Sequence, residues 1–371
     1  MSGKLQFCIF AHSWLSDWNH GNAHFLRGLA RELVRLGHGV RCYEEQGSWS
    51  LSNLMQEGEI ADRAIEQFRR EFPELNIHFY QQGPALRSVL EEELRGTDVV
   101  IVHEWTDPDV AHQILLYQKR FGFRALFHDT HHRAYTNAGE ILRFPLDQFD
   151  GVLAFGDPIR RIYLDGFGAR RAWTFHEAAD VAHFHPLDAR REFDLLWVGN
   201  WGDEERTAEL MEYLVGPIAN ISGCKVVAYG VRYPEQGRRS LRAAGIEYRG
   251  YLPSLMAPEA YARSALSLHV PRRQYTNGLS GIPTIRVFEA LACGATLVCA
   301  PWNDVEQLFR PGEDYVVAGS GGDMHASLQW LLNDETARRQ IGANGRESIL
   351  QRHTCQHRAQ QLVEICEELN R

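Results

Sequence analysis

Short apolar segments alternate with amphipathic helical patterns along this chain, and the alternation runs twice. Residues 5–11 predict a strand, and residues 24–36 predict a helix with one apolar face that ends at Gly37. Residues 99–102 are apolar without alternation, as expected for a parallel strand buried on both faces. The pattern restarts with a strand at 195–198. Two such runs predict an α/β protein with two doubly wound, Rossmann-like parallel sheets that face each other across a cleft.

The boundary between the two runs is marked by a break in the alternation. His185-Pro186-Leu187-Asp188 interrupts the pattern within residues 184–191. We therefore predict an N-terminal domain over residues 1–187 and a C-terminal domain over residues 188–352. An amphipathic helix over residues 353–371, with Thr354 as its N-cap, completes the chain.

Composition excludes several classes of protein. A net charge of −9 over 371 residues argues against a broad electrostatic grip on nucleic acid. No run approaches the roughly 18 consecutive apolar residues of a membrane span, and the first residues lack a signal-peptide cleavage site. Seven scattered cysteines without a C-x-x-C pair favour a reducing compartment. We expect a cytoplasmic protein with no nucleic-acid partner and no integral membrane segment. Peripheral membrane association and oligomeric state are not addressed by the sequence.

The most specific motif is GIPTIRVFEALACGATLVCAP, from Gly281 to Pro301. It predicts a helix that follows the glycine-rich loop Asn277-Gly278-Leu279-Ser280-Gly281. Backbone N–H groups of such a loop, together with a helix N-terminus, can hold a diphosphate. This stretch closely resembles the donor-site helix of GT-B glycosyltransferases.

The resemblance covers most of the chain. Residues 21–40 are similar to the first βα unit of that family, residues 175–186 to its interdomain linker and residues 198–206 to the first strand and loop of its donor domain. Residues 346–358 resemble the closing segment of the CgeB-like (spore-maturation-protein type) branch of the glycosyl transferases group 1 family. The match is weaker over the first 150 residues, where acceptors bind.

The resemblance implies a GT-B glycosyltransferase that needs no metal and no cofactor. Its donor substrate is a nucleoside diphosphate sugar (UDP, GDP or TDP) bound by the C-terminal domain. The N-terminal domain binds the acceptor, and the final helix packs back onto that domain.

The resemblance also implies a set of donor-binding residues. Glu289 matches the glutamate that accepts hydrogen bonds from ribose hydroxyls, while Arg286 and Arg206 are candidates for phosphate binding. The alternative is that these residues are only structural. In that case the helix is simply a buried helix capped by Gly294, and Arg206 is a surface partner of Glu204 or Glu205. The expected donor-binding residues are Glu289, Arg286, Gly281, Ser280, Gly278, Asn277, Arg206, Asn200, Gly199, Gly230 and Tyr251.

Two positions depart from the family pattern. Gly281 stands where many retaining GT-B enzymes carry a second, sugar-contacting glutamate, eight positions before the ribose-binding one. Asn200 replaces the arginine of the usual phosphate-binding arginine–lysine pair, and no lysine follows. Arg206 is the nearest cation that could substitute.

Catalytic candidates follow three predicted strands of the N-terminal half. His128 matches the histidine that approaches the sugar ring in many GT-B enzymes, although it could simply cap a turn. Asp129 could fix the imidazole tautomer or act as the base on the acceptor hydroxyl, and Glu104 and Asp17 are alternative bases. Trp14, Trp18 and Trp105 also lie on loops after strands, where an indole face can pack against a sugar.

Other signals are weaker. His128, Asp129, His131 and His132 could be a metal site, but we expect none. Residues 107–109 (Asp-Pro-Asp) are expected to form a surface turn, and no G-x-G-x-x-G follows the first strand.

We therefore predict transfer of a sugar from a nucleoside diphosphate sugar to an unidentified acceptor, which could be a glycan, a natural product or a protein. The alternatives are a nucleotide-sugar 2-epimerase of the same fold, a non-catalytic nucleotide-sugar-binding protein and, last, a carbohydrate- or protein-binding scaffold.

Overall fold

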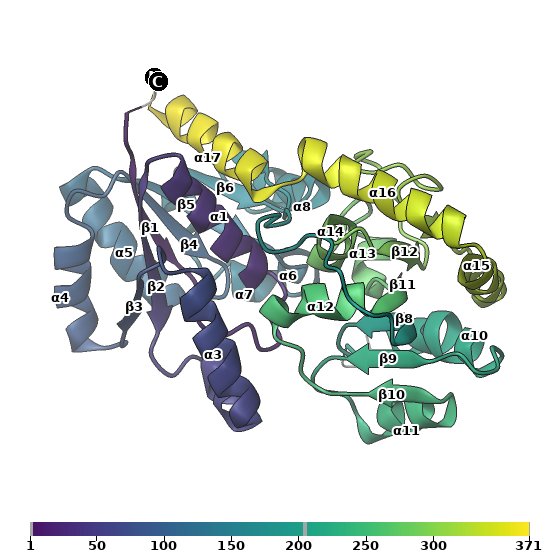
Figure 1. The fold of residues 1–371 in the computed structure, drawn as a ribbon. Helices are drawn as coiled ribbons and strands as arrows, with labels where there is room; N and C mark the ends of the chain where they lie inside the picture. The colour runs from purple at the N-terminus through teal and green to yellow at the C-terminus, as the bar shows by residue number, and fades with distance from the viewer. Residues whose placement is uncertain (1–2, 203–205, 371) are drawn as a thin grey trace. The chain divides into compact units, whose positions relative to one another are not determined.

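The computed structural model describes residues 3–202 and 206–370. It divides into two units, one made of residues 1–177 and 355–371 and the other of residues 178–354 (Figure 1). The sequence predicts the first boundary at 187/188, whereas the structure places it at 177/178. Ala179 explains the difference, because its N–H donates to the carbonyl of His353 (2.9 Å), within the second unit.

The first unit contains an all-parallel sheet of order β3-β2-β1-β4-β5-β6-β7. Its strands are β1 (Gln6–Phe10), β2 (Gly39–Glu45), β3 (Ile77–Tyr80), β4 (Val99–His103), β5 (Arg124–Asp129), β6 (Gly151–Ala154) and β7 (Ala172–Thr174). Its α-helices are α1 (Ala23–Arg35), α2 (Trp49–Leu54), α3 (Glu59–Glu71), α4 (Pro84–Glu93), α5 (Pro108–Phe121), α6 (Arg133–Thr136), α7 (Ala138–Ile141), α8 (Asp157–Arg161) and α17 (Cys355–Leu369). The last helix, α17, packs against α1, and its Cys355 Sγ lies 3.9 Å from the carbonyl oxygen of Phe25.

The second unit contains a parallel sheet of order β10-β9-β8-β11-β12-β13. Its strands are β8 (Phe193–Val198), β9 (Val226–Tyr229), β10 (Ile246–Tyr248), β11 (Ser264–His269), β12 (Thr296–Cys299) and β13 (Val316–Val317). Its α-helices are α9 (Thr207–Leu210), α10 (Gly216–Ala219), α11 (Glu235–Ala243), α12 (Ala257–Ala262), α13 (Arg273–Asn277), α14 (Ile285–Ala292), α15 (Gly321–Asn333) and α16 (Glu335–Arg352).

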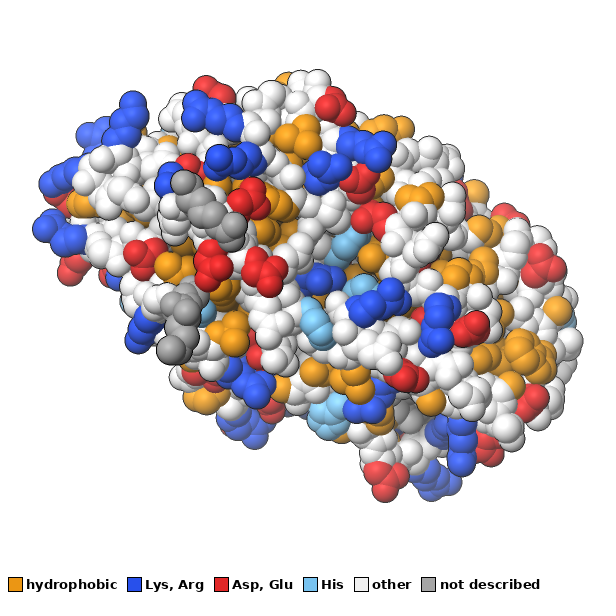
Figure 2. Space-filling view, turned by 90° about the horizontal axis from the view of Figure 1, so that it is seen from above, with side chains coloured by type: hydrophobic (Ala, Val, Ile, Leu, Met, Phe, Trp, Pro, Cys, Tyr) orange, Lys and Arg blue, Asp and Glu red, His pale blue; other side chains and the backbone are white. Residues whose placement is uncertain are grey.

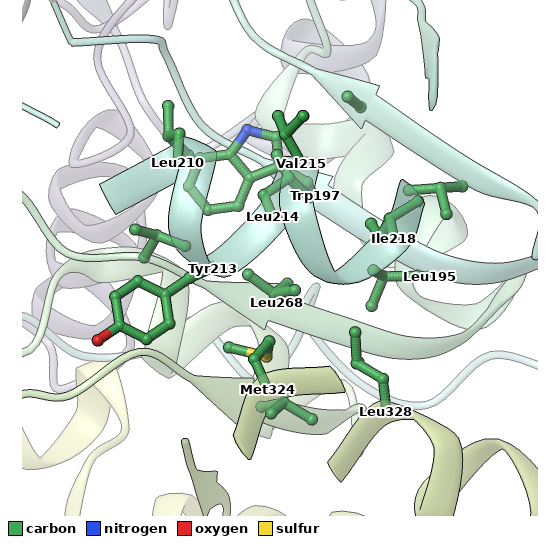
Figure 3. Packing of buried hydrophobic residues seen from close by; sticks show 14 of the residues in the cluster. Leu195, Trp197, Leu210, Tyr213, Leu214, Val215, Ile218, Leu268, Met324 and Leu328 are labelled. Atoms are coloured by element: carbon green, nitrogen blue, oxygen red, sulfur yellow. The ribbon is translucent and has the colours of Figure 1, made fainter. Parts of the chain in front are cut away.

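The core of the second unit holds the strand ends in place. Figure 3 shows Trp197 of β8 and Leu268 of β11 beside Leu214, Met324 and Leu328 from the covering helical segments. Burying side chains of this size contributes about 1.5–3 kcal/mol each. The loops that leave the carboxyl ends of β8 and β11 therefore start from fixed points.

Two of the predicted helices differ in the structure, each for a local reason. Residues 305–309 are not helical, because the carboxylate of Asp304 accepts hydrogen bonds from the N–H groups of Leu308 and Phe309 and so competes with helical bonding. The predicted helix over 56–72 is broken at Gly58, whose φ of 61° ends one helical segment before α3 begins. The short strands β7 and β13 carry too few residues for a periodic signal.

A net charge of −9 predicts that no face of the protein is strongly basic. On the face drawn in Figure 2, blue and red side chains are interspersed. Across the two described ranges, every helix falls short of the length and apolarity that a membrane crossing requires.

Candidate functional site

Two glycine loops meet at the carboxyl ends of β8 and β9. A Cβ atom on Gly230 would lie 2.2 Å from the carbonyl oxygen of Gly199, so only glycine fits there. The same oxygen accepts a hydrogen bond from Tyr233 Oη (2.6 Å), which in turn accepts one from Trp197 Nε1 (2.7 Å). Tyr251 is next to Gly250, whose carbonyl accepts the Gly230 N–H (2.8 Å). Buried side chains thus fix the backbone at this edge of the sheet.

Asn200 and Arg206 lie at the same edge. Asn200 Oδ1 accepts the N–H of Val231 (2.9 Å), so Asn200 holds the loop after β9. Arg206 is buried, its Nη1 donates to the carbonyl of Val270 (2.9 Å), and its guanidinium lies 5.4 Å from the centre of the Trp197 ring. Arg206 is therefore positioned beyond the end of β11. Glu204 and Glu205, its alternative partners, lie outside the described residues.

The central pair of the motif is an ion pair on α14. Glu289 is fully buried, and its Oε2 lies 2.5 Å from Arg286 Nη1 and 3.5 Å from Tyr261 Oη. Burial and the negative charge of Glu289 raise the pKa of Tyr261. Arg286, one turn earlier, therefore compensates the buried charge of Glu289.

The loop before α14 explains the missing second glutamate. Asn277 ends α13, and Gly278 and Ser280 belong to the turn that follows. Gly281 has a φ of 93°, and a Cβ there would lie 2.6 Å from Val305 Cγ2. A glutamate at this position would therefore need a different backbone.

In the first unit, Glu104 follows β4 and is bound by Arg133. Arg133 Nε and Nη2 lie 3.1 and 2.9 Å from Glu104 Oε2, while Glu104 Oε1 accepts the N–H of Thr130 (3.1 Å). The guanidinium also stacks over the Trp105 ring at 3.7 Å. Burial and the neighbouring Asp129 raise the pKa of Glu104, and Arg133 opposes this.

Asp129 and His128 end β5 and point to different surroundings. Asp129 Oδ2 accepts from Tyr163 Oη (2.7 Å) and its Oδ1 from the N–H of His131 (2.9 Å), and burial raises its pKa. The His128 ring lies 6.0 Å from Phe25 and 5.8 Å from Phe175, measured between ring centres, and burial lowers its pKa to about 3. Both are thus buried parts of the first unit.

Asp17 holds the loop after β1. Its Oδ2 lies 3.3 Å from Arg27 Nη1, and Arg27 Nε donates to the carbonyl of Trp14 (2.7 Å). Trp14 is fully buried and Trp18 nearly so, whereas Trp105 is half-buried. Of the three tryptophans, Trp105 presents the most accessible ring.

The side chains that could ligate a metal ion are not gathered around one point among the described residues. Among residues 3–202 and 206–370, no three His, Cys, Asp or Glu side chains are placed to hold a metal ion. That includes the group His128, Asp129, His131 and His132.

Comparison with known proteins gives a family match over part of the chain and a fold match over nearly all of it. Residues 206–364 match the family model described as "Glycosyl transferase-like". No curated protein sequence matches the chain. Among solved structures, sucrose-phosphate synthase from Thermosynechococcus elongatus has a TM-score of 0.67 at 13% identity, covering 99% of each chain. HepE from Anabaena, in complex with UDP and glucose, has a TM-score of 0.69 at 12% identity, covering 98% of this chain and all of that one. A glycosyltransferase from Rickettsia africae has a TM-score of 0.67 at 10% identity, covering 100% and 99%.

The chain has the GT-B fold, and its residues 206–364 are similar to a glycosyl transferase-like family. The matched region contains Arg206, α14 and the loop before it, so most of the expected donor-binding residues lie within this region.

Sequence reasoning missed an imidazole cluster in the first unit. We use this name for His12, His20, His103 and His131, which lie on the loops and ends of β1, β4 and β5 around Trp105. Ring centres are 3.9 Å apart for His12–His20, 5.5 Å for His12–His103 and 5.3 Å for Trp105–His131. Burial lowers the pKa of His20 to about 3 and also lowers those of His12 and His103. Neither ring nitrogen of His12 has a hydrogen-bond partner.

It also missed His269, the last residue of β11. This side chain is buried, its Nε2 lies 3.1 Å from Thr284 Oγ1, and its Nδ1 has no hydrogen-bond partner. The available signal was its position at the end of a parallel strand, where ligands bind in such folds.

Proposed function

We propose that this enzyme transfers a glycosyl group from a nucleoside diphosphate sugar, held by the second unit, to an acceptor held by the first. The observation that carries the proposal is the convergence of Arg206, the glycine loops and α14 at the carboxyl edge of one parallel sheet. This edge is where doubly wound sheets bind nucleotides. HepE, which has the same fold, was crystallised with UDP and with UDP-glucose, and this supports a uridine nucleotide as the first candidate.

On the donor side, we assign the ribose to Glu289 and the phosphates to Arg206, Arg286 and the N–H groups that begin α14. Without ligand, Arg286 compensates the buried charge of Glu289. An incoming diphosphate would attract Arg286 and leave Glu289 oxygens for the ribose hydroxyls. The same cations would stabilise the leaving diphosphate, and we propose that no metal is needed for this. The remaining loop residues, Asn277, Gly278, Ser280, Gly281, Gly199, Asn200, Gly230 and Tyr251, would shape the backbone around the nucleotide.

On the acceptor side, we assign the acceptor to the imidazole cluster and Trp105. Neutral imidazoles offer one donor and one acceptor each, which suits hydroxyl groups. Of the predicted catalytic residues, Glu104 is our candidate base, since it lies next to Trp105 and burial raises its pKa above the usual range of a carboxyl group. Asp129 and Asp17 would position loops, and His128 would pack in the core at the end of β5.

The test of the donor site is a thermal-shift screen of UDP, GDP, TDP and their sugars. A ligand that binds only the folded state raises the melting temperature. Glu289→Gln should lose most of the shift, whereas Glu347→Gln, an exposed change on α16, should keep it. A full shift in the Glu289 variant would refute the ribose assignment. Incubating the binding sugar nucleotide without acceptor then separates transfer from epimerisation, because only an epimerase would isomerise the donor.

A further inference from the structure

His269 occupies a place in the second unit that the donor residues above do not explain. It ends β11, is 4% exposed, and its carbonyl accepts the N–H of Ala300 (2.8 Å). Its Nδ1 is buried and has no hydrogen-bond partner. A buried polar atom without a partner costs about 1–3 kcal/mol, so such atoms call for an explanation.

Thr284 contacts the other ring nitrogen of His269. Its Oγ1 lies 3.1 Å from His269 Nε2, and as N-cap of α14 it makes no side-chain capping bond. The hydroxyl is therefore available to donate to Nε2. If it does so, the neutral ring carries its proton on Nδ1, and Nδ1 becomes a donor that awaits an acceptor.

The surroundings favour an anionic acceptor. Arg206 is close enough to lower the pKa of His269, after burial, to about 3, so the ring is neutral at any working pH. Thr284 also begins α14, whose eight residues direct a partial positive charge toward this point. A cation would be repelled here, whereas a phosphate oxygen would be attracted.

We propose that the His269 Nδ1–H group donates a hydrogen bond to a phosphate oxygen of the nucleoside diphosphate, with Thr284 fixing the tautomer. This inference rests on the proposed function, since it needs a nucleotide in the second unit. It adds a neutral, directional donor to the cations Arg206 and Arg286. His269 is thus a substrate-binding residue, and Thr284 is a positioning residue that acts through it.

The experiment uses two isosteric amides. In His269→Asn the amide nitrogen takes the place of Nδ1, and in His269→Gln it takes the place of Nε2. The dissociation constant of the nucleoside diphosphate found in the screen, UDP as the first probe, is measured by calorimetry. A hydrogen bond to a charged oxygen is worth roughly 10- to 100-fold in affinity. We expect His269→Gln to lose about that factor and His269→Asn to stay within a few-fold of the unaltered enzyme.

Thr284 supplies the second arm, which leaves the histidine in place. Thr284→Val should weaken UDP binding because the tautomer is no longer fixed, and Thr284→Ser should restore it. In the His269→Gln background Thr284→Val should have no further effect, which a purely structural role would not predict. Melting curves without ligand identify any variant that fails to fold.

The outcomes separate the two ideas. Equal affinities for the Asn and Gln variants, or equal effects of Thr284→Val with and without His269, overturn this inference alone. If the unaltered enzyme binds none of UDP, GDP or TDP, the proposed function fails and the inference fails with it.

Discussion

Arg286 Nη1 lies 2.5 Å from Glu289 Oε2, one helical turn away on α14, and the glutamate it contacts is fully buried. This pair gives the most specific motif of the sequence two tasks. Without ligand, Arg286 balances a carboxylate that the interior could not otherwise tolerate. Under the proposed function, a bound diphosphate would give the same arginine a stronger partner, and the carboxylate would then accept from the ribose.

The pair predicts that removing Arg286 alone destabilises the protein more than removing both charges. Arg286→Met should lower the free energy of unfolding by roughly 3 kcal/mol, because it leaves a buried charge without a partner. Adding Glu289→Gln should restore much of that loss, since the charge is then gone. Urea unfolding of the two variants measures both values. If the double variant is no more stable than Arg286→Met, the carboxylate is not the source of the cost.

The fold was predictable because its signals are local. The uninterrupted apolar residues 99–102 and the glycine stop at Gly37 specify a strand and a helix end whatever surrounds them. Two runs of such signals are enough for two parallel sheets. What the sequence concealed depends on single side chains, as at Asp304, whose carboxylate ends helical bonding over residues 305–309.

The site was predictable only where a motif carried it. Glu289, Arg286 and Gly281 come from one contiguous segment. The ion pair between Arg286 and Glu289, however, depends on their side-chain rotamers, which the sequence does not specify. His12 and His269 have no motif at all, and their unpartnered nitrogens depend on distant parts of the chain. Conversely His128, at an expected position, packs among Phe25 and Phe175.

Gly230 is predicted to be essential to the donor edge. In Gly230→Ala the new methyl would meet the Gly199 carbonyl oxygen at 2.2 Å, and backbone cannot move aside as a side chain can. We expect a loss of at least about 2 kcal/mol in unfolding free energy and a lost nucleotide-induced melting shift. Gly322→Ala, on α15, is the control, because its Cβ would meet only Ser320 Oγ at 3.7 Å. It should be neutral or slightly stabilising, and a similar loss in both variants would show that the close approach is not the cause.

The imidazole cluster is predicted to act on the acceptor alone. His12→Ala should reduce glycosyl transfer by at least about tenfold, as loss of a positioned polar group does, while the affinity for nucleotide is unchanged. His112→Ala, an exposed histidine on α5 of the same unit, should leave transfer intact. Steady-state transfer assays and nucleotide calorimetry on both variants provide the comparison. An equal loss of nucleotide affinity in His12→Ala would contradict the assignment.

Glu44 is predicted to make the first unit less stable as pH rises. This buried residue of β2 accepts the N–H groups of Trp14 and Leu15 (2.8 Å each), so it holds the loop that follows β1. Burial raises the pKa of Glu44 from 4.5 to about 7, although these bonds and the charge of Arg27 lower it. The folded state therefore binds the proton more tightly than the unfolded state between about pH 4.5 and 7, and the contribution of Glu44 to stability falls across that window by roughly 3 kcal/mol.

Glu44→Gln keeps an oxygen for both N–H groups but cannot ionise, so it should remove this slope. Glu45→Gln changes the half-buried neighbour and should retain the slope. Urea unfolding from pH 4.5 to 8 measures the three slopes, and an unchanged slope in Glu44→Gln would place the titrating group elsewhere.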